Sequence, residues 1–333
     1  MEARTWNADE VIRLANGYWG VFALQALAAT GLAARLAKGP ATANALAASL
    51  GLDPKGADML LVACKGLGLL GGRGDGYALA PGLEQLLDPD SPDSLHNYIM
   101  HMHDMAPDWA RLPQAVASGR PVAQRGGQHD SPARRHFYGA MAELARMRAP
   151  LVAPSLGLRP GMRLLDLGGG PGIYALSFTR FQPGLAATVF DLPGAEPHFR
   201  REAKSRGLEG KVGYIVGDYN NDDLGGPYDV VWLSQVLHGV GPAVCRKLVG
   251  KAAQALAPGG ALWVQEFVLD RRNPSPPFAA LFALNMLINT EGGRGYTAEE
   301  ISQFMIEAGL GQCEYSGPLP PGSPVGLVRG VKP

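Results

Sequence analysis

The sequence predicts an α/β protein in which a doubly wound, mostly parallel sheet follows a smaller, mainly helical N-terminal domain. From residue 159 onward, short apolar runs alternate with segments of helical periodicity, which is typical of a doubly wound sheet. A turn of consecutive glycines directly follows the first of these runs. Before residue 80 the order is helix, turn, helix and hairpin, which is the winged-helix pattern. A length of 333 residues is enough for two such domains.

Composition and charge argue against nucleic acid or a membrane as a partner. The chain has 30 Lys and Arg residues against 30 Asp and Glu residues, so no net charge draws it to either. The Ala-rich residues 21–37 are interrupted by polar side chains and are too short to span a bilayer. Cys64, Cys245 and Cys313 have neither C-x-x-C nor zinc spacing, and residues 1–6 lack the order of a signal peptide. We therefore expect a cytoplasmic protein.

The N-terminal domain is predicted to consist of helices followed by a small hairpin. Residues 8–38 carry apolar side chains at helical spacing, and residues 41–50 are expected to form a further helix. Asp53 before Pro54 is a start signal for a helix that runs to about Leu67, and the hairpin then follows over residues 69–79. DNA-binding helices show a basic face, whereas in the helix that runs to about Leu67 two aspartates balance the charge of the two lysines. A DNA-binding function is therefore not favoured.

The C-terminal domain is organised around the glycine turn. An apolar strand over residues 163–167 leads through the turn into a helix over residues 173–181. A dinucleotide fingerprint fits this stretch only weakly, whereas an acid followed by G-x-G-x-G fits it well through Asp166, Gly168 and Gly170. A carboxylate repels phosphates and attracts an ammonium or sulfonium group. The pattern therefore favours S-adenosylmethionine, with Asp166 orienting its amino-acid part.

Two further acids are predicted to share the crevice with the glycine turn. Asp191 ends a strand over residues 187–191, and Asp218 ends the next strand, directly before Tyr219. The carboxyl ends of parallel strands meet at one edge of a sheet. We expect Asp191 to bind the ribose and Asp218 the adenine amino group, with Tyr219 stacking on the ring. Further strands are predicted at about 230–234 and 261–268, with an antiparallel edge pair at 312–316 and 325–329.

Four motifs together resemble a known family. They are Leu-Asp-Leu-Gly-Gly-Gly-Pro-Gly at 165–172, Phe-Asp-Leu-Pro at 190–193, Gly-Asp-Tyr at 217–219, and Leu237-His238. This set is similar to the small-molecule S-adenosylmethionine-dependent O-methyltransferases, which include caffeate-type and hydroxyindole-type enzymes and many bacterial natural-product enzymes. The resemblance covers nearly the whole chain.

The resemblance implies an organisation and a reaction. Residues 1–100 are expected to form a winged-helix dimerisation domain that builds a homodimer. Residues 101–155 would be connecting helices that contribute to the substrate pocket, and residues 156–333 would form the cofactor-binding methyltransferase domain. The expected reaction transfers a methyl group to a hydroxyl of a small aromatic or conjugated secondary metabolite. The same fold and cofactor also allow C- or N-methylation, or a cyclase or decarboxylase reaction.

The resemblance also implies site residues. His238, just past the fourth strand, is the expected general base, since a neutral imidazole is the natural base near pH 7. Glu266 would orient it by a hydrogen bond, and Leu192 and Ser234 would contact the cofactor. The sequence departs from the family pattern at two positions, where acids are replaced by Gly239 and Gly295. Nearby Glu291 is a candidate substitute, and the departures leave the identity of the acceptor atom open.

Two helices are expected to line the substrate pocket. The helix over residues 131–149 would contribute Phe137 and Met141, and the helix over residues 278–290 would contribute Met286 and Asn289. Histidines also cluster in the connecting region. They are His96, His101 and His103. We expect no metal there, because no carboxylate-rich segment accompanies these histidines.

Overall fold

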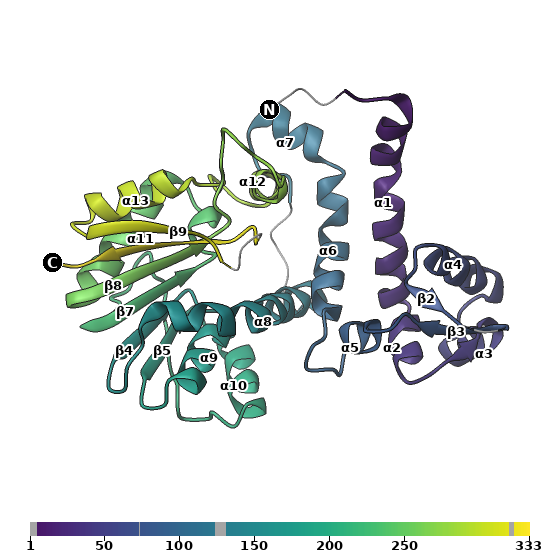
Figure 1. Cartoon of the computed structure of the whole chain (residues 1–333), viewed down its shortest axis with the longest axis horizontal. Helices are drawn as coiled ribbons and strands as arrows, with labels where there is room; N and C mark the ends of the chain where they lie inside the picture. Colours follow the sequence, from purple (N-terminus) through teal and green to yellow (C-terminus); the bar gives the residue numbers. More distant parts are fainter. Residues whose placement is uncertain (1–4, 73, 124–130, 320–322) are drawn as a thin grey trace. The chain divides into compact units, whose positions relative to one another are not determined.

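A computed structural model describes residues 5–72, 74–123, 131–319 and 323–333. Residues 1–4, on which part of the signal-peptide argument rests, and Arg73 of the expected hairpin lie outside the described residues. The chain divides into two compact units. One unit comprises Met1–Ala106 and Ser131–Glu143, and the other comprises Pro107–Asp130 and Leu144–Pro333 (Figure 1). None of the helices described is long and apolar enough to cross a membrane.

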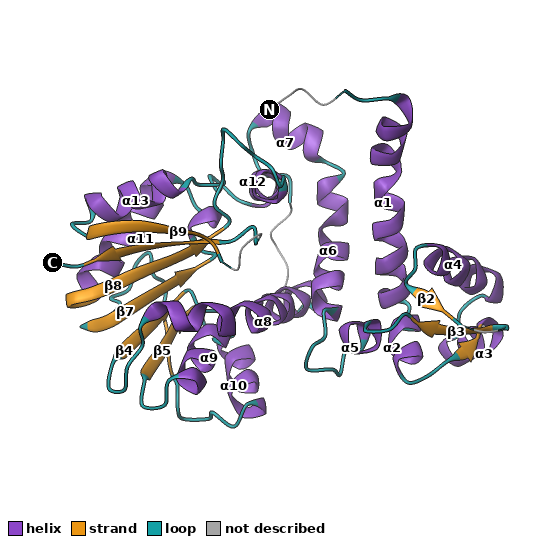
Figure 2. Cartoon of the chain, viewed as in Figure 1, coloured by secondary structure: helices purple, strands orange, loops and turns teal. Residues whose placement is uncertain are grey.

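The first unit contains a helical core and a small antiparallel sheet (Figure 2). The strands pair in the order β1-β3-β2. Buried leucines of α1, α2, α3 and α4 form its core. The elements are α1 (Ala8–Ala29), α2 (Leu32–Ala37), β1 (Ala41–Thr42), α3 (Ala43–Leu50), α4 (Pro54–Gly66), β2 (Leu70–Gly71), β3 (Gly76–Leu79), α5 (Leu83–Leu87), most of α6 (His96–Trp109) and the first part of α8 (Pro132–Val152).

One local prediction in this unit is wrong. Ala41 and Thr42 were expected at the start of a helix, but they form β1 and pair with β3, with Ala41 opposite Tyr77. The helix begins two residues later, at Ala43, because the Thr42 side chain caps it, accepting a hydrogen bond from the Ala45 amide at 3.3 Å. The predicted Asp53 cap is confirmed, since its side chain accepts a hydrogen bond from the Gly56 amide at 2.8 Å.

A buried carboxylate fixes the start of α6. Glu143 on α8 is 2% exposed, and its Oε1 accepts hydrogen bonds from the Asn97 amide at 3.0 Å and from Asn97 Nδ2 at 2.7 Å. Its Oε2 accepts the Tyr98 amide at 2.8 Å. The first amides of a helix have no partner within it and carry a partial positive charge. A glutamate from another helix therefore satisfies them here and joins α6 to α8.

The second unit is built on a seven-stranded sheet with the order β6-β5-β4-β7-β8-β10-β9. The first five strands in that order are parallel, and the last two are antiparallel, as expected from the sequence. The elements are α7 (Leu112–Ser118), η1 (Ala153–Leu156), β4 (Arg163–Leu167), α9 (Ile173–Phe181), β5 (Ala186–Asp191), α10 (Glu196–Ser205), β6 (Gly213–Val216), β7 (Tyr228–Ser234), η2 (Leu237–Gly239), α11 (Pro242–Ala255), β8 (Leu256–Glu266), α12 (Phe278–Asn289), α13 (Ala298–Glu307), β9 (Gly311–Pro318) and β10 (Gly326–Val331).

Both faces of this sheet are buried. Along β7, Val230 and Trp232 join the core that α9 and α10 cover, whereas Val231 and Leu233 join the core that α11 and α13 cover (Figure 1). Successive side chains of a strand point to opposite faces, so a strand buried on both sides is a continuous apolar run. This accounts for the apolar runs in the sequence and confirms the predicted doubly wound α/β fold.

Replacing Glu143 with glutamine tests the role of its carboxylate in the first unit. Glutamine keeps one acceptor oxygen but turns an NH₂ group toward a backbone amide, which leaves a buried donor unpaired. We expect Glu143→Gln to lower the free energy of unfolding by about 1–3 kcal/mol. Urea denaturation followed by circular dichroism measures this, with the exposed Glu209→Gln as the control. Equal midpoints for the two variants would contradict the role.

Candidate active site

The candidate site lies at the carboxyl edge of the parallel strands. The strand order reverses between β4 and β7, and ligands of open α/β sheets bind at such a switch point. The Gly217 amide donates to the Asp191 carbonyl at 3.0 Å, which links the ends of two strands directly. Five of the residues predicted from the sequence follow this edge, at or just beyond the ends of successive strands. They are Asp218, Asp191, Asp166, Ser234 and Glu266.

The glycine turn folds back tightly against the sheet. Gly168 has φ 70°, a backbone conformation that favours glycine, and its amide donates to the Phe190 carbonyl at 2.8 Å. A Cβ at this position would lie 2.8 Å from a methyl group of Val236. The turn therefore passes so close to the segment after β7 that only glycine fits.

Asp166 is almost completely buried beneath this turn. Its Oδ2 accepts a hydrogen bond from the Ala175 amide at 3.1 Å, in the first turn of α9. Its Oδ1 is also buried and has no hydrogen-bond partner among the described residues. Burial, with a smaller contribution from the nearby Asp191 carboxylate, raises the pKa of the carboxyl to about 7. An unpaired buried oxygen of this kind fits a cationic ligand group.

Asp191 is held by hydrogen bonds from the glycine turn and from its own loop, and Asp218 is held by hydrogen bonds from its own loop. Asp191 accepts the Gly170 amide and the Leu192 amide, both at 2.6 Å, and burial raises its pKa. Asp218 Oδ1 accepts both the amide and the Nδ2 of Asn220 at 2.9 Å. Each carboxylate oxygen has two lone pairs, so both acids retain capacity to accept hydrogen bonds from a ligand.

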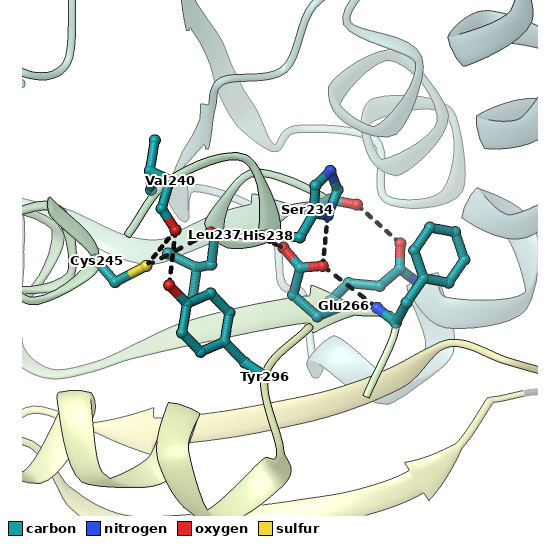
Figure 3. A network of polar contacts seen from close by, with 9 residues as sticks. Ser234, Leu237, His238, Val240, Cys245, Glu266 and Tyr296 are labelled. Carbon is teal, nitrogen blue, oxygen red and sulfur yellow. Dashed lines mark hydrogen bonds and ion pairs between the residues drawn. The ribbon is translucent and has the colours of Figure 1, made fainter. Parts of the chain in front are cut away.

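His238 and Glu266 form a hydrogen-bonded pair (Figure 3). His238 lies on η2, directly after β7, and its Nδ1 is 2.7 Å from Glu266 Oε2. Oε1 of the same carboxylate accepts the His238 backbone amide at 3.2 Å. The carboxylate only accepts, so Nδ1 carries the proton and Nε2 is the free acceptor. The imidazole is 14% exposed, which leaves it accessible to a small molecule.

Aromatic rings flank this imidazole, and no sequence motif indicated them. Phe282 on α12 meets the His238 ring edge-on, with ring centroids 4.8 Å apart. The Phe267 ring centroid lies 6.2 Å from the centroid of the imidazole and 4.4 Å from that of Phe282. These rings make the surroundings of the imidazole apolar and flat.

A second polar network near the base was also missed. Ser234 Oγ donates to Gln265 Oε1 at 2.9 Å, and the buried Tyr174 hydroxyl donates to the same oxygen. Gln235 has φ 58°, rare for a residue with a side chain, and both atoms of its side-chain amide are buried without a partner in the described part of the chain. Strained, unpaired polar residues cluster at functional sites.

The two departures from the family pattern differ in their surroundings. A Cβ at Gly239 would meet nothing within 4 Å, whereas one at Gly295 would lie 3.3 Å from Ala283 and 3.4 Å from Leu269. The suggested substitute, Glu291, is exposed and makes no hydrogen bond or ion pair within the described ranges. Glu266 is therefore the carboxylate that contacts the imidazole.

The four expected pocket residues lie on the expected helices. Phe137 and Met141 belong to the part of α8 in the first unit. There the Phe137 ring meets the His101 ring edge-on, with ring centroids 5.5 Å apart. Met286 and Asn289 lie on α12 in the second unit, and Met286 is buried.

A side-chain hydrogen bond joins α12 to Trp109 within the second unit. Asn289 Nδ2 donates to Asn285 Oδ1 at 3.0 Å, and the same oxygen accepts the Trp109 indole at 3.1 Å. No group of three or more metal-ligating side chains occurs in the part of the chain that the structure describes.

The fold and the site together define a class of enzyme. A doubly wound sheet carries a tight glycine turn, acids at the ends of three neighbouring strands and a histidine–glutamate pair at the same edge. The acids suit a nucleoside cofactor that carries positive charge, and the imidazole provides a base.

Comparisons with known proteins identify the family. Residues 109–311 match the model of an O-methyltransferase domain, and residues 12–85 match an O-methyltransferase dimerisation domain. The chain is 31% identical over 330 residues to 3-hydroxy-5-methyl-1-naphthoate 3-O-methyltransferase of Streptomyces sahachiroi, covering 96% of this chain and 94% of the relative. It is 32% identical to acetylserotonin O-methyltransferase of Mus musculus, covering 95% of this chain and 87% of the relative.

A solved structure gives the same result. Human N-acetylserotonin methyltransferase in complex with S-adenosylmethionine superposes with a TM-score of 0.88 at 26% identity, and the match covers 100% of this chain and 99% of that one. The chain belongs to the O-methyltransferase family, and it is an S-adenosylmethionine-dependent methyltransferase. The resemblance drawn from the sequence motifs is confirmed.

The raised pKa of Asp166 predicts pH-dependent cofactor binding. In the free protein this carboxyl keeps its proton up to about pH 7, whereas a cationic ligand prefers the ionised form. Affinity is therefore complete above the raised pKa and is lost as the pH falls below it. We expect the Kd of S-adenosylhomocysteine to increase by roughly tenfold between about pH 7.5 and about pH 6.

Isothermal titration calorimetry measures this dependence, with Asp166→Asn as the matched control. Asparagine keeps an acceptor for the Ala175 amide but does not titrate. The variant should bind more weakly and without the pH dependence. A flat profile in the unmodified protein would contradict the role of Asp166.

Proposed function

We propose that this enzyme methylates a hydroxyl group of a small aromatic metabolite, with His238 as the general base. The contact between His238 Nδ1 and Glu266 Oε2 at 2.7 Å is the observation that carries the proposal. In the neutral ring this contact keeps the proton on Nδ1, so that Nε2 is the nitrogen that accepts a proton. The chain's relatives include a naphthoate O-methyltransferase and acetylserotonin O-methyltransferases, which supports an aromatic acceptor.

The residues present fit the cofactor. Asp166 offers a buried, unpaired oxygen for a cationic group, and Asp191 and Asp218 retain lone pairs for the ribose and the adenine amino group. Leu192, which is exposed beside Asp191, and the half-buried Tyr219 would flank the adenine. When bound, the cofactor supplies an electrophilic methyl group on a positively charged sulfur.

The protein's own residues would then move one proton. His238 Nε2 would take the proton of the acceptor hydroxyl as the new C–O bond replaces the C–S bond of the bound cofactor. The sulfur would then leave as a neutral thioether, and the acceptor oxygen would carry no full charge. The resulting imidazolium is stabilised by Glu266, which is 2% exposed and therefore acts in surroundings of low polarity. The carboxylate also prevents rotation of the imidazole ring, so Nε2 stays directed at the acceptor hydroxyl.

The aromatic rings around the base support the proposed substrate class. Phe282 and Phe267 lie against one another and beside His238. Flat apolar surfaces bind aromatic molecules by offset or edge-on ring contacts. They also exclude water, which favours in-line attack by a positioned oxygen. We further assign Met286 and Asn289, both on α12, to the substrate pocket.

We also propose that the protein is a homodimer built by its N-terminal unit. Helix α1 exposes a row of large apolar side chains, among them Leu14 at 71% and Trp19 at 61% exposure. A contiguous apolar surface of this kind marks an interface. The match of residues 12–85 to an O-methyltransferase dimerisation domain supports this assignment.

Removing the base tests the mechanism. A positioned base contributes about 10²–10⁴ in rate, so we expect His238→Ala to slow methyl transfer by that factor. Binding of S-adenosylhomocysteine should change little, because the cofactor acids lie on other strands. Glu266→Gln should cost less, since it only misorients the ring. Both rates are measured on the best acceptor found by screening phenolic and polyketide hydroxyl compounds.

Full turnover by His238→Ala on that acceptor would overturn the base assignment. Mass spectrometry and NMR of the product identify the methylated atom. A product methylated on carbon or nitrogen would contradict the O-methylation proposal while leaving the cofactor site intact.

Substitution on α1 tests the dimer. Sedimentation velocity at micromolar concentration should show a dimer for the unmodified protein. Leu14→Glu should produce monomers, because it places a charge in the buried interface. Ile306→Glu on α13, which is 55% exposed, is the control and should leave the dimer intact. A monomeric unmodified protein would refute the assignment.

A further inference from the structure

The turn that carries His238 receives hydrogen bonds from three separate donors. The Tyr296 hydroxyl donates to the Val240 carbonyl at 2.6 Å, and the Cys245 thiol donates to the Leu237 carbonyl at 3.5 Å (Figure 3). The Arg294 backbone amide donates to the carbonyl of His238 itself at 2.9 Å. Carbonyls in and directly after the turn are thus satisfied from outside it.

Tyr296 is held as rigidly as the turn that it contacts. It is 1% exposed, and its ring meets Phe304 edge-on, with centroids 5.6 Å apart. The Arg294 guanidinium lies over the same ring at 4.7 Å and pairs with Glu300. A buried ring with contacts on its faces and edge cannot follow a shift of the turn, so its hydroxyl defines one position for the Val240 carbonyl.

Both side-chain donors stay protonated at working pH. Burial raises the pKa of the Tyr296 hydroxyl. Burial likewise raises the pKa of the Cys245 thiol to about 11. Neither group serves as a nucleophile or a base in this state, so their function is to donate hydrogen bonds.

The chain approaches the turn too closely for a side chain at Gly293. A Cβ there would lie 2.6 Å from the His238 carbonyl oxygen and 2.1 Å from Thr290 Oγ1. The segment that contains Gly293, Arg294 and Tyr296 therefore packs directly against the turn that carries the base. Gly295, in the same segment, stands where the family pattern has an acid that could act on the imidazole.

We propose that Tyr296, with Cys245, is a positioning residue that fixes the turn so that His238 Nε2 faces the acceptor. The proposal rests on the proposed role of His238 as the base. Glu266 fixes the imidazole from its Nδ1 side, and the two donors fix the backbone from which the ring projects. With glycine at both family acid positions, this backbone support replaces a second carboxylate. Tyr296 acts through His238 and need not touch the substrate.

Tyr228 provides a matched control for a purely structural role. It is a buried tyrosine of the same hydrophobic core, and its hydroxyl donates to the Leu224 carbonyl at 3.1 Å. It lies at the first residue of β7, whereas η2 follows the other end of that strand. Tyr228→Phe therefore removes an equivalent hydrogen bond without touching the turn.

The experiment compares Tyr296→Phe with Tyr228→Phe. Thermal denaturation should show that the two substitutions lower the melting temperature by similar amounts. Small displacements at a reacting group are costly, so Tyr296→Phe should reduce kcat about tenfold, with the KM of the cofactor unchanged. Tyr228→Phe should change kcat by less than about twofold, as is usual away from a site. In a His238→Ala background, Tyr296→Phe should have no further effect on the rate.

Equal kcat values for the two tyrosine variants would overturn the proposal, as would a full additional loss in the His238→Ala background. Cys245→Ala and Cys245→Ser provide a second test should Tyr296→Phe not fold. Serine keeps a donor and should retain more of kcat than alanine, and equal losses would also count against positioning. Full activity of His238→Ala alone would instead refute the proposed base, so the two failures are distinguishable.

Discussion

The hydrogen bond between His238 and the buried carboxylate of Glu266 links the chemistry of this protein to its sheet. Glu266 is the last residue of β8, and His238 lies on the turn after β7, so pairing of these two strands brings them together. An unpaired carboxylate at this depth would be costly, and the imidazole and two backbone amides satisfy it. The fold thus determines which nitrogen of the histidine carries the proton.

The same edge of the sheet combines two electrostatic environments. On the side of β4, β5 and β6, carboxylates gather around the glycine turn and suit a cationic cofactor. On the side of β7 and β8, aromatic rings flank the His238 imidazole and suit an apolar acceptor. In the proposed mechanism the methyl group passes from the first environment to the second, at the switch point between β4 and β7.

Features encoded in consecutive residues could be predicted from the sequence. The helix after the glycine turn has the predicted ends, and Asp53 caps α4 as expected. Contacts between distant segments could not be predicted. The pairing of Ala41 with β3 depends on a partner far along the chain, and Phe282 reaches His238 from a helix whose pattern is merely apolar. The left-handed backbone of Gln235 has no sequence signal at all.

The pH dependence of a single turnover tests the central claim most directly. With cofactor and acceptor both bound, the rate reports the proton transfer step without product release. The account predicts that the rate of the unmodified protein rises with pH to a plateau, because a general base acts only in its unprotonated form, and that the His238→Ala rate is low and lacks this rise. A pH-independent rate in the unmodified protein, or the same rise in His238→Ala, would contradict the account.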